Sequence, residues 1–195
     1  MKSITAEEKV AAFTEELRRI FDKKVREFTK LCVTQSPDYF FLDCPSSSTG
    51  KYHPLDELGA DGVLIHTKKV YTMAYELVKG MACEGSRDVV LAACVIHDLR
   101  KQGLVKRGHT DMRRHCALAA DLVDEVQEAT QLLTKEQHDM LRGCVGYHLG
   151  PWSYEPWKKP LSEYTAEELV VYISDFTVSK RFVQVDYQRR PGLGI

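Results

Sequence analysis

The stretch Ala92-Ala-Cys-Val-Ile-His-Asp-Leu-Arg-Lys101 joins an apolar run to a histidine and an aspartate. From Val89 onward, apolar residues recur at the three- and four-residue steps typical of a helix, and Ser86 is placed to cap that helix at its N-terminus. The pattern therefore predicts an apolar helix that ends near His97 and is followed at once by Asp98. A His-Asp pair alone arises by chance in many chains, so its meaning depends on the rest of the sequence.

Apolar residues recur at helical spacing over most of the chain. Capping boxes of the form Thr-x-x-Glu or Thr-x-x-Gln begin at Thr5, Thr134 and Thr165. The predicted helices are one long helix over residues 5–31 and shorter helices over 63–83, 86–97, 112–128, 134–148 and 165–176. The β-branched run Val170–Ile173 lies inside one of these helical periods, so it does not predict a strand. The sequence therefore predicts an all-α fold.

Length and composition predict a single domain. A chain of 195 residues with 44% apolar and 28% charged residues is typical of one soluble globular unit. Within residues 1–195 we expect an N-terminal helix over 1–34, a functional loop over 35–62, a helical core over 63–183 and a tail over 184–195. The loop prediction rests on prolines and glycines without a sustained period, and long loops in compact domains tend to be functional or disordered.

Charge and cysteine content limit the class of protein. The formal net charge of −1 gives no overall signature of a nucleic-acid binder. No apolar run approaches the roughly 20 residues that a bilayer span needs, so we expect no membrane partner. The six cysteines form no C-x-x-C pair, and no signal peptide is recognised at the N-terminus. Reduced thiols in the cytoplasm are therefore expected, or in the host cytoplasm if the protein is phage-encoded.

Histidines and one further acid stand at the ends of other apolar stretches. His66, His115 and His148 fall near the starts and ends of predicted helices, and Asp175 closes the apolar stretch around Val170–Ile173. Burying an ionised carboxylate without a partner costs free energy. Asp175 therefore implies a cation or a strong hydrogen-bond network.

Together with His97 and Asp98, these residues resemble the H…HD…H…H…D pattern of the HD superfamily of metal-dependent phosphohydrolases. The resemblance covers roughly residues 45–182 and implies a single HD-type helical domain with a metal-binding core. It implies that a first divalent ion is held by His66, His97, Asp98 and Asp175. It also implies a second ion held by His115 and His148, with Asp98 as the bridge. His109, six residues before His115, competes with it for this role.

The ligand types suit the chemistry that the resemblance implies. Imidazoles and carboxylates bind Mn, Fe, Co, Ni or Zn, and Mg more weakly, so the identity of the metal stays open. A bound ion lowers the pKa of its water towards neutrality and makes hydroxide available to attack phosphorus. The resemblance gives catalytic roles to Asp98 and to Lys101, whose ammonium can neutralise a phosphate oxygen. The basic stretch 100–114 is either a phosphate-attracting rim or a solvated loop.

The Ser-rich loop, residues 44–54, reads Cys-Pro-Ser-Ser-Ser-Thr-Gly-Lys-Tyr-His-Pro. Gly50 and Lys51 match half of a P-loop, but Tyr52 stands where the magnesium-binding hydroxyl belongs and Pro45 where the first glycine belongs. The loop instead resembles the P-x-S-S-x-G-K-Y-H-P segment of some HD exoribonucleases and phage HD proteins. We expect it to form a rim that binds the polar end of the substrate. The residues predicted to bind substrate are Ser47, Ser48, Thr49, Lys51, His53, Trp152, Lys180 and Arg181.

The function implied by the resemblance is hydrolysis of a phosphoester. A nucleotide or related small phosphorylated molecule is favoured, because the chain has no appended nucleic-acid-binding domain and a net charge near zero. Other members of the superfamily leave open a dNTP triphosphohydrolase, a phosphodiesterase and a 3′ exoribonuclease acting on a nucleic-acid end. Two alternatives come from other classes of function. They are a diiron HD-type oxygenase and a non-catalytic metal-binding module.

Overall fold

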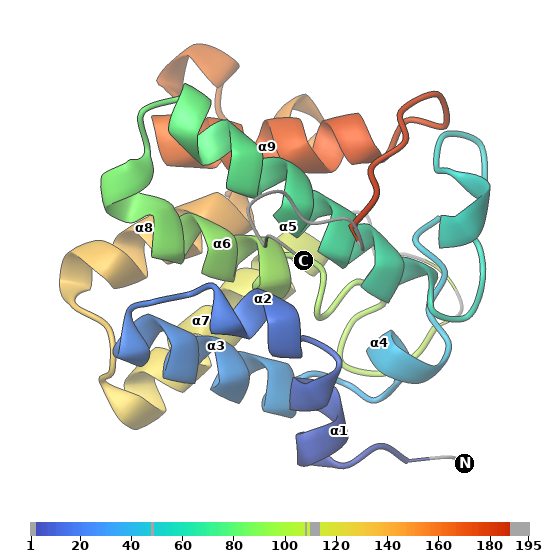
Figure 1. The fold of residues 1–195 in the computed structure, drawn as a ribbon, viewed down its shortest axis with the longest axis horizontal. Coiled ribbons are helices and arrows are strands. Elements are labelled where there is room, and N and C mark those ends of the chain that lie inside the picture. Colours follow the sequence, from blue (N-terminus) through green and yellow to red (C-terminus); the bar gives the residue numbers. More distant parts are fainter. Residues whose placement is uncertain (1–2, 48, 108, 110–113, 188–195) are drawn as a thin grey trace, which may run out of the picture.

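The structure is a computed structural model that describes residues 3–47, 49–107, 109 and 114–187. Within these ranges the regular elements are α-helices and short 3-10 turns, which confirms the predicted all-α fold (Figure 1). The α-helices are α1 (Ala6–Ala11), α2 (Thr14–Arg18), α3 (Lys23–Gln35), α4 (Tyr39–Leu42), α5 (Gly62–Gly80), α6 (Arg87–Ile96), α7 (His115–Thr130), α8 (Lys135–Gly146) and α9 (Ala166–Val178). The 3-10 turns are η1 (Leu55–Glu57), η2 (Glu84–Ser86), η3 (Gly150–Trp152) and η4 (Leu161–Glu163).

The prediction of one long N-terminal helix is wrong, because this segment forms the three helices α1, α2 and α3. The chain leaves helical geometry at Phe13, where φ is −115° and ψ is 18°. After the short helix α2, the helix α3 begins behind Asp22, whose carboxylate accepts the backbone N–H groups of Lys24 and Val25 at 2.8 and 3.1 Å. The apolar stripe itself is buried as expected, with Phe13, Val25 and Phe28 in the core.

The capping boxes at Thr5, Thr134 and Thr165 are all confirmed, and each threonine side chain accepts the N–H group three residues later. Ser86 precedes α6 but does not cap it with its side chain. Its hydroxyl donates instead to Glu167 at 2.7 Å, so it joins the start of α6 to the start of α9.

The predicted loop over 35–62 contains more structure than expected. It includes α4, whose Phe40 is fully buried and packs edge-on against Phe41 with ring centroids 4.9 Å apart. Backbone hydrogen bonds join its two ends, including Ser46 N–H to the Glu57 carbonyl at 2.9 Å. A Cβ atom at Gly62 would lie 1.9 Å from that same carbonyl, so only glycine fits where α5 begins.

The core is organised around α6, in which every side chain from Val89 to Ile96 is buried. This helix packs against α3, α5, α8 and α9, and it lies in the middle of the bundle (Figure 1). The residues that follow its C-terminal end, His97 and Asp98, therefore lie inside the protein. Each of the six cysteines is free and buried, as expected for reduced thiols. Among the described residues, no helix has the length and apolar character needed to cross a membrane.

Candidate metal centre

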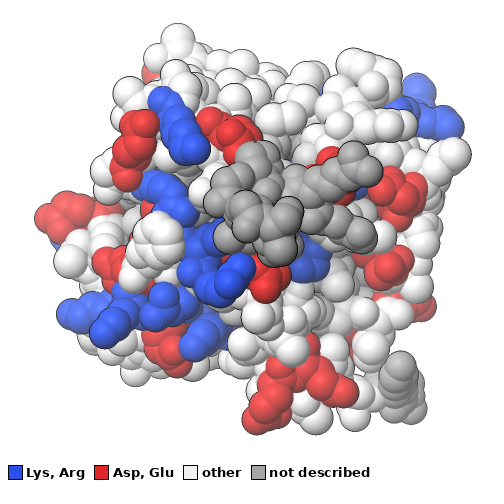
Figure 2. All heavy atoms as spheres, viewed as in Figure 1, with Lys and Arg blue, Asp and Glu red and all other residues white. Residues whose placement is uncertain are grey.

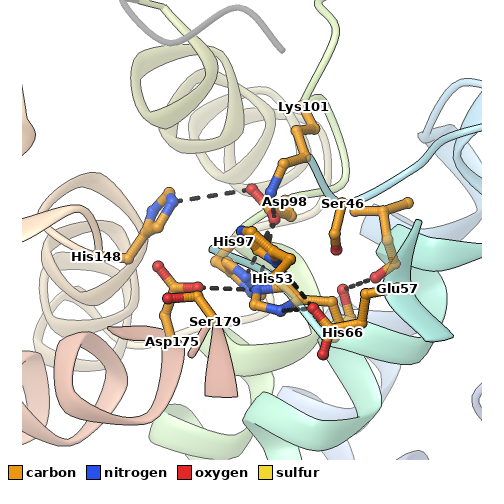
Figure 3. Close-up of polar contacts among 12 residues, drawn as sticks. Ser46, His53, Glu57, His66, His97, Asp98, Lys101, His148, Asp175 and Ser179 are labelled. Atoms are coloured by element: carbon orange, nitrogen blue, oxygen red, sulfur yellow. Dashed lines mark hydrogen bonds and ion pairs between the residues drawn. The ribbon is translucent and has the colours of Figure 1, made fainter. Parts of the chain in front are cut away.

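The six predicted metal ligands meet around the C-terminal end of α6. They are His66 in α5, His97 and Asp98 after α6, His115 at the start of α7, His148 after α8 and Asp175 in α9. Asp175 is 15% exposed at its side chain, and the other five are buried. Figure 3 shows all of them except His115 gathered in one place. Residues that span more than half of the sequence are thus brought together.

Asp98 lies between two groups of histidines. Its Oδ2 atom is 3.5 Å from His97 Nε2 and 4.0 Å from His66 Nε2. Its Oδ1 atom is 3.7 Å from His115 Nε2 and 3.9 Å from His148 Nε2. This is the arrangement expected of a carboxylate shared by two ions. His109 is exposed, so His115 is the histidine that faces Asp98.

The outer nitrogen of three histidines is already occupied by a hydrogen bond. Nδ1 of His97 donates to the Cys94 carbonyl at 2.8 Å, and Nδ1 of His148 donates to the Val145 carbonyl at 2.6 Å. His66 Nδ1 lies 3.1 Å from the carboxylate of Glu57. In a neutral ring whose Nδ1 carries the proton, as in His148, Nε2 presents a lone pair to the centre. Each ring is therefore oriented as a metal ligand requires.

Two polar atoms at the centre lack a hydrogen-bond partner among the described residues. They are His97 Nε2 and Asp98 Oδ1, and both are buried. A buried acceptor without a donor costs free energy, whereas a cation placed beside it would satisfy it. Mixed imidazole and carboxylate donors also suit divalent first-row metals. The residues present therefore fit a divalent metal site.

The electrostatics of the centre keep its carboxylates charged. Burial raises the pKa of Asp175. The hydrogen bond from His66 and the charges of nearby histidines lower it by more, so the pKa lies below its usual range. The pKa of Asp98 is also below its usual range despite burial, mainly because of the positive charge of Lys101. Burial lowers the pKa of His66, but its hydrogen bonds to Asp175 and Glu57 outweigh burial and raise the pKa to about 9. The ring therefore gives up a proton when Nε2 binds a metal ion. Burial and the neighbouring His97 and His115 lower the pKa of His148 to about 3, so its ring is neutral.

The sequence did not indicate Glu57, which supports the centre from behind. Its buried carboxylate bonds His53 at 2.8 Å, His66 at 3.1 Å and Lys69 at 3.0 Å. Burial raises the pKa of Glu57, but its bonds to the two histidines outweigh this and leave the pKa below its usual range. Histidines that bind a metal commonly donate their other N–H group to a carboxylate, so an acidic residue is expected beside His66. The sequence offers several acids in residues 56–61, and only the fold selects Glu57.

Cys116 is a second residue that sequence reasoning missed. Its buried sulfur lies 3.7 Å from His115 Nε2 and 3.8 Å from His148 Nε2. Burial, followed by the charges of Asp98 and Asp175, raises the pKa of this thiol. The only signal in the sequence was its position next to His115.

A cavity of about 560 Å³ opens above the centre. Asp98, Lys101, His115, His148 and Asp175 form the part of its wall that carries the predicted chemistry. Of the predicted substrate-binding residues, the cavity is lined by Ser47, Thr49, His53, Trp152 and Lys180. Ser48 lies outside the described residues. The sequence had not indicated other lining residues, namely Ser46, Tyr52, Leu149, Tyr172, Phe176 and Ser179.

The structure places two predicted substrate-binding residues away from the cavity lining. Lys51 is exposed, and its ammonium lies 5.1 Å from the centre of the Tyr52 ring. Arg181 is also exposed, but its backbone N–H donates to the Tyr52 carbonyl at 2.8 Å. This bond joins the Ser-rich loop to the chain just after α9. Arg181 thus supports the wall through its backbone.

The described basic residues Arg100, Lys101 and Lys106 have different environments. Arg100 is buried and forms hydrogen bonds to Glu125 at 3.0 and 2.5 Å, so it is a structural residue. Lys106 pairs with Asp43 on the surface. Lys101 is buried, pairs with Asp98 and lines the cavity. Burial lowers its pKa, but Asp98 and Asp175 outweigh this and raise it, so its ammonium stays charged.

Comparison with known proteins supports the assignment of the centre. A family model for the HD domain matches residues 63–177, which include all six ligand positions. No curated protein and no solved structure gave a match. HD domains are typical of metal-dependent hydrolases, and the buried His and Asp clusters agree with this. The chain belongs to the HD domain family of the metal-dependent phosphohydrolase superfamily.

Proposed function

We propose that this protein is a metal-dependent phosphohydrolase that acts on a nucleotide or a related small phosphoester. The observation that carries the proposal is the cavity, which has histidines and carboxylates in one wall and hydroxyls and aromatic rings in the others. Its volume of about 560 Å³ is within the range of small-molecule sites. The near-neutral net charge of −1 also favours a small substrate over a nucleic-acid chain.

The ligand sets support two divalent ions that share Asp98. His66, His97 and Asp175 would hold one ion, and His115 and His148 would hold the other. When bound, such ions activate a water molecule and neutralise charge on a phosphoryl group. Lys101 holds its ammonium 2.5 Å from Asp98 and lines the cavity, so it adds a positive charge beside the same position.

Polar and flat surfaces of the cavity suit the two ends of a nucleotide. The hydroxyls of Ser47 and Thr49 in the Ser-rich loop can donate to phosphate oxygens. Trp152 lies parallel to Phe176, with ring centroids 5.4 Å apart and an angle of 8°, and it is 54% exposed. An exposed indole of this kind can stack on a nucleobase, an interaction worth about 1–3 kcal/mol.

The surface charge gives further support for a small substrate. Figure 2 shows Lys and Arg side chains gathered over α2 and α3, with Asp and Glu side chains among them in the uncovered part of that face. On the visible part of this face, signs mixed in this way do not make the continuous basic track along which single-stranded nucleic acids bind. The proposed location is the cytoplasm, supported by the six free and buried cysteines.

A substrate panel tests the proposal. Purified protein would be given dNMPs, dNTPs, cyclic dinucleotides and short RNA in the presence of Mn or Co, and the products would be identified. We expect hydrolysis of a mononucleotide, which Asp98→Ala should abolish. His138→Ala is the matched control, because His138 bonds Asp124 at 2.9 Å and does not line the cavity. Activity on RNA alone would overturn the nucleotide assignment, and oxygen uptake with iron but no phosphate release would favour the oxygenase.

A further inference from the structure

Three donor atoms cluster on the α7 side of the centre, and a fourth lies beside two of them. His115 Nε2 and His148 Nε2 are 3.2 Å apart, and Cys116 Sγ lies 3.7 and 3.8 Å from them. Asp98 Oδ1 is 3.7 and 3.9 Å from the same two nitrogens, and Figure 3 shows His148 opposite Asp98. Two nitrogens and one sulfur therefore lie together, and the Asp98 oxygen lies near both nitrogens.

The separations among the His115, Cys116 and His148 atoms are close to those between ligands of one tetrahedral metal ion. With metal–nitrogen and metal–oxygen bonds near 2.1 Å and a metal–sulfur bond near 2.3 Å, tetrahedral ligand atoms lie about 3.3–3.6 Å apart. The observed separations differ from this by only a few tenths of an ångström. Consecutive residues of a helix point about 100° apart around its axis. The convergence of His115 and Cys116 on one point is therefore a specific feature of the start of α7.

The surroundings of the four atoms also favour a cation. Asp98 Oδ1 is buried, lacks a hydrogen-bond partner among the described residues, and faces the two histidines. Nδ1 of His148 donates to the Val145 carbonyl at 2.6 Å, which leaves the lone pair of Nε2 directed towards His115 and Cys116. The Cys116 side chain is itself buried, so its sulfur is turned to this point and away from solvent.

We propose that the Cys116 thiol releases its proton to solvent when a metal binds and becomes a thiolate ligand of the ion held by His115, His148 and Asp98. This inference rests on the proposed function, in which those two histidines bind the second ion. Thiolate is a soft donor that favours Zn, Co or Fe over Mg or Mn, whereas the His66, His97 and Asp175 set offers only nitrogen and oxygen. The two positions of the centre thus differ in metal preference, and the Cys116 position takes the softer ion.

Spectroscopy of the cobalt-loaded protein tests the assignment without turnover. Wild-type protein loaded with two equivalents of Co(II) should show a thiolate-to-cobalt charge-transfer band in the near ultraviolet. Cys116→Ser should lose the band, and Cys83→Ser should keep it, because Cys83 is buried away from the centre and bonds the Met81 carbonyl. Absence of the band in the wild type, or its survival in Cys116→Ser, would overturn the proposal.

Two further measurements keep the test decisive. Removing a partner of a ligand costs about 10–100-fold in metal affinity, so removing a direct ligand should cost at least tenfold. Cys116→Ser should therefore bind its second Zn at least tenfold more weakly, and unchanged affinity would contradict the assignment. X-ray absorption of the wild type with two Zn needs no variant, and one sulfur neighbour at about 2.3 Å per pair of ions is expected. If the metal has a sulfur neighbour but the protein hydrolyses no phosphoester, only the proposed function is wrong. If the protein hydrolyses a phosphoester but the metal has no sulfur neighbour, only the assignment of Cys116 is wrong.

Discussion

At the scale of single residues, the centre depends on side chains that do not face the cavity. Glu57 is the main example, because one buried carboxylate bonds His53, His66 and Lys69. It holds Nδ1 of His66 and thereby directs Nε2 towards Asp175, 2.8 Å away. Lys69 compensates the charge of Glu57 within the interior, and Asp56 bonds the same lysine at 2.8 Å from the surface.

Replacing Glu57 with glutamine keeps the shape of the side chain but removes its charge. We expect Glu57→Gln to weaken metal binding at the His66 position by about 10–100-fold, the usual cost of losing the partner of a ligating histidine. Competition with a chromophoric chelator measures this directly. Asp56→Asn is the matched control, since Asp56 bonds Lys69 but not His66. Equal effects of the two substitutions would show that Glu57 acts only through Lys69.

Two lysines near the Ser-rich loop should differ in their effect on substrate binding. Lys180 lines the cavity, with its ammonium 3.8 Å from the centre of the Phe176 ring, whereas Lys51 is exposed outside the lining. Hydrogen bonds to charged groups contribute about 1.5–3 kcal/mol, so Lys180→Ala should raise KM by about tenfold or more. Lys51→Ala should change KM much less. Steady-state kinetics with the substrate found in the panel would check this, and a larger effect at Lys51 would contradict it.

At the scale of elements, capping residues were readable from the sequence but the N-terminal breaks were not. The three capping boxes fixed the starts of α1, α8 and α9 because their spacing is local. The break before α3 was hidden, because apolar residues continue at helical spacing across it and no proline or glycine marks it. The residue that indicates this break is Asp22, which is the N-cap of α3. It accepts two backbone N–H groups and also Gln137 at 3.2 Å, a tertiary contact that no local pattern shows.

The Asp22 cap should make the stability of the protein depend on pH. The Val25 N–H holds the pKa of Asp22 below its ordinary value of 3.8. The charged cap therefore stabilises the folded state above pH 3.8, and this contribution is lost as the pH falls through the lower pKa of the folded state. Asp22→Ala should lower the free energy of unfolding by about 1 kcal/mol at pH 7, and by less in acid.

Urea unfolding at neutral and acidic pH measures the Asp22 effect. Asp22→Asn is the matched variant, because asparagine caps helices nearly as well but has no charge to lose. It should keep most of the stability and lose this part of the pH dependence. A cost for Asp22→Ala that is the same at both pH values would show that the carboxylate charge is irrelevant.

At the scale of the whole molecule, the six histidines and aspartates that meet in the candidate centre were predictable, but the residues that support them were not. The six residues form a pattern of residue types in a fixed order, which can be read from the sequence alone; they are His66, His97, Asp98, His115, His148 and Asp175. Glu57, Cys116 and Phe176 are brought to the centre or its cavity by packing between segments far apart in the chain, which the sequence alone does not show. Lys51 was predicted from the letters of the Ser-rich loop, which do not show which side chains line the cavity, and its role in substrate binding stays a prediction.

Metal removal should destabilise the entire protein. Without a cation, His97 Nε2 and Asp98 Oδ1 stay buried and lack a hydrogen-bond partner among the described residues. Free metal at 100 times its dissociation constant would raise the free energy of unfolding by about 2.7 kcal/mol relative to the chelated protein. Urea unfolding with and without a chelator measures the difference. Asp98→Ala should lose this response, and a wild-type protein that unfolds identically in both conditions would argue against tight metal binding.

The hydrogen bond between His66 and Asp175 has a consequence for the order of folding. The two residues are 109 positions apart, and closing so long a loop carries a large entropy cost that nearer contacts avoid. During synthesis, the segment that carries His66, His97, Asp98, His115 and His148 leaves the ribosome before α9 does. Asp175 arrives with α9, so the nascent chain becomes able to complete its candidate ligand set only when α9 docks.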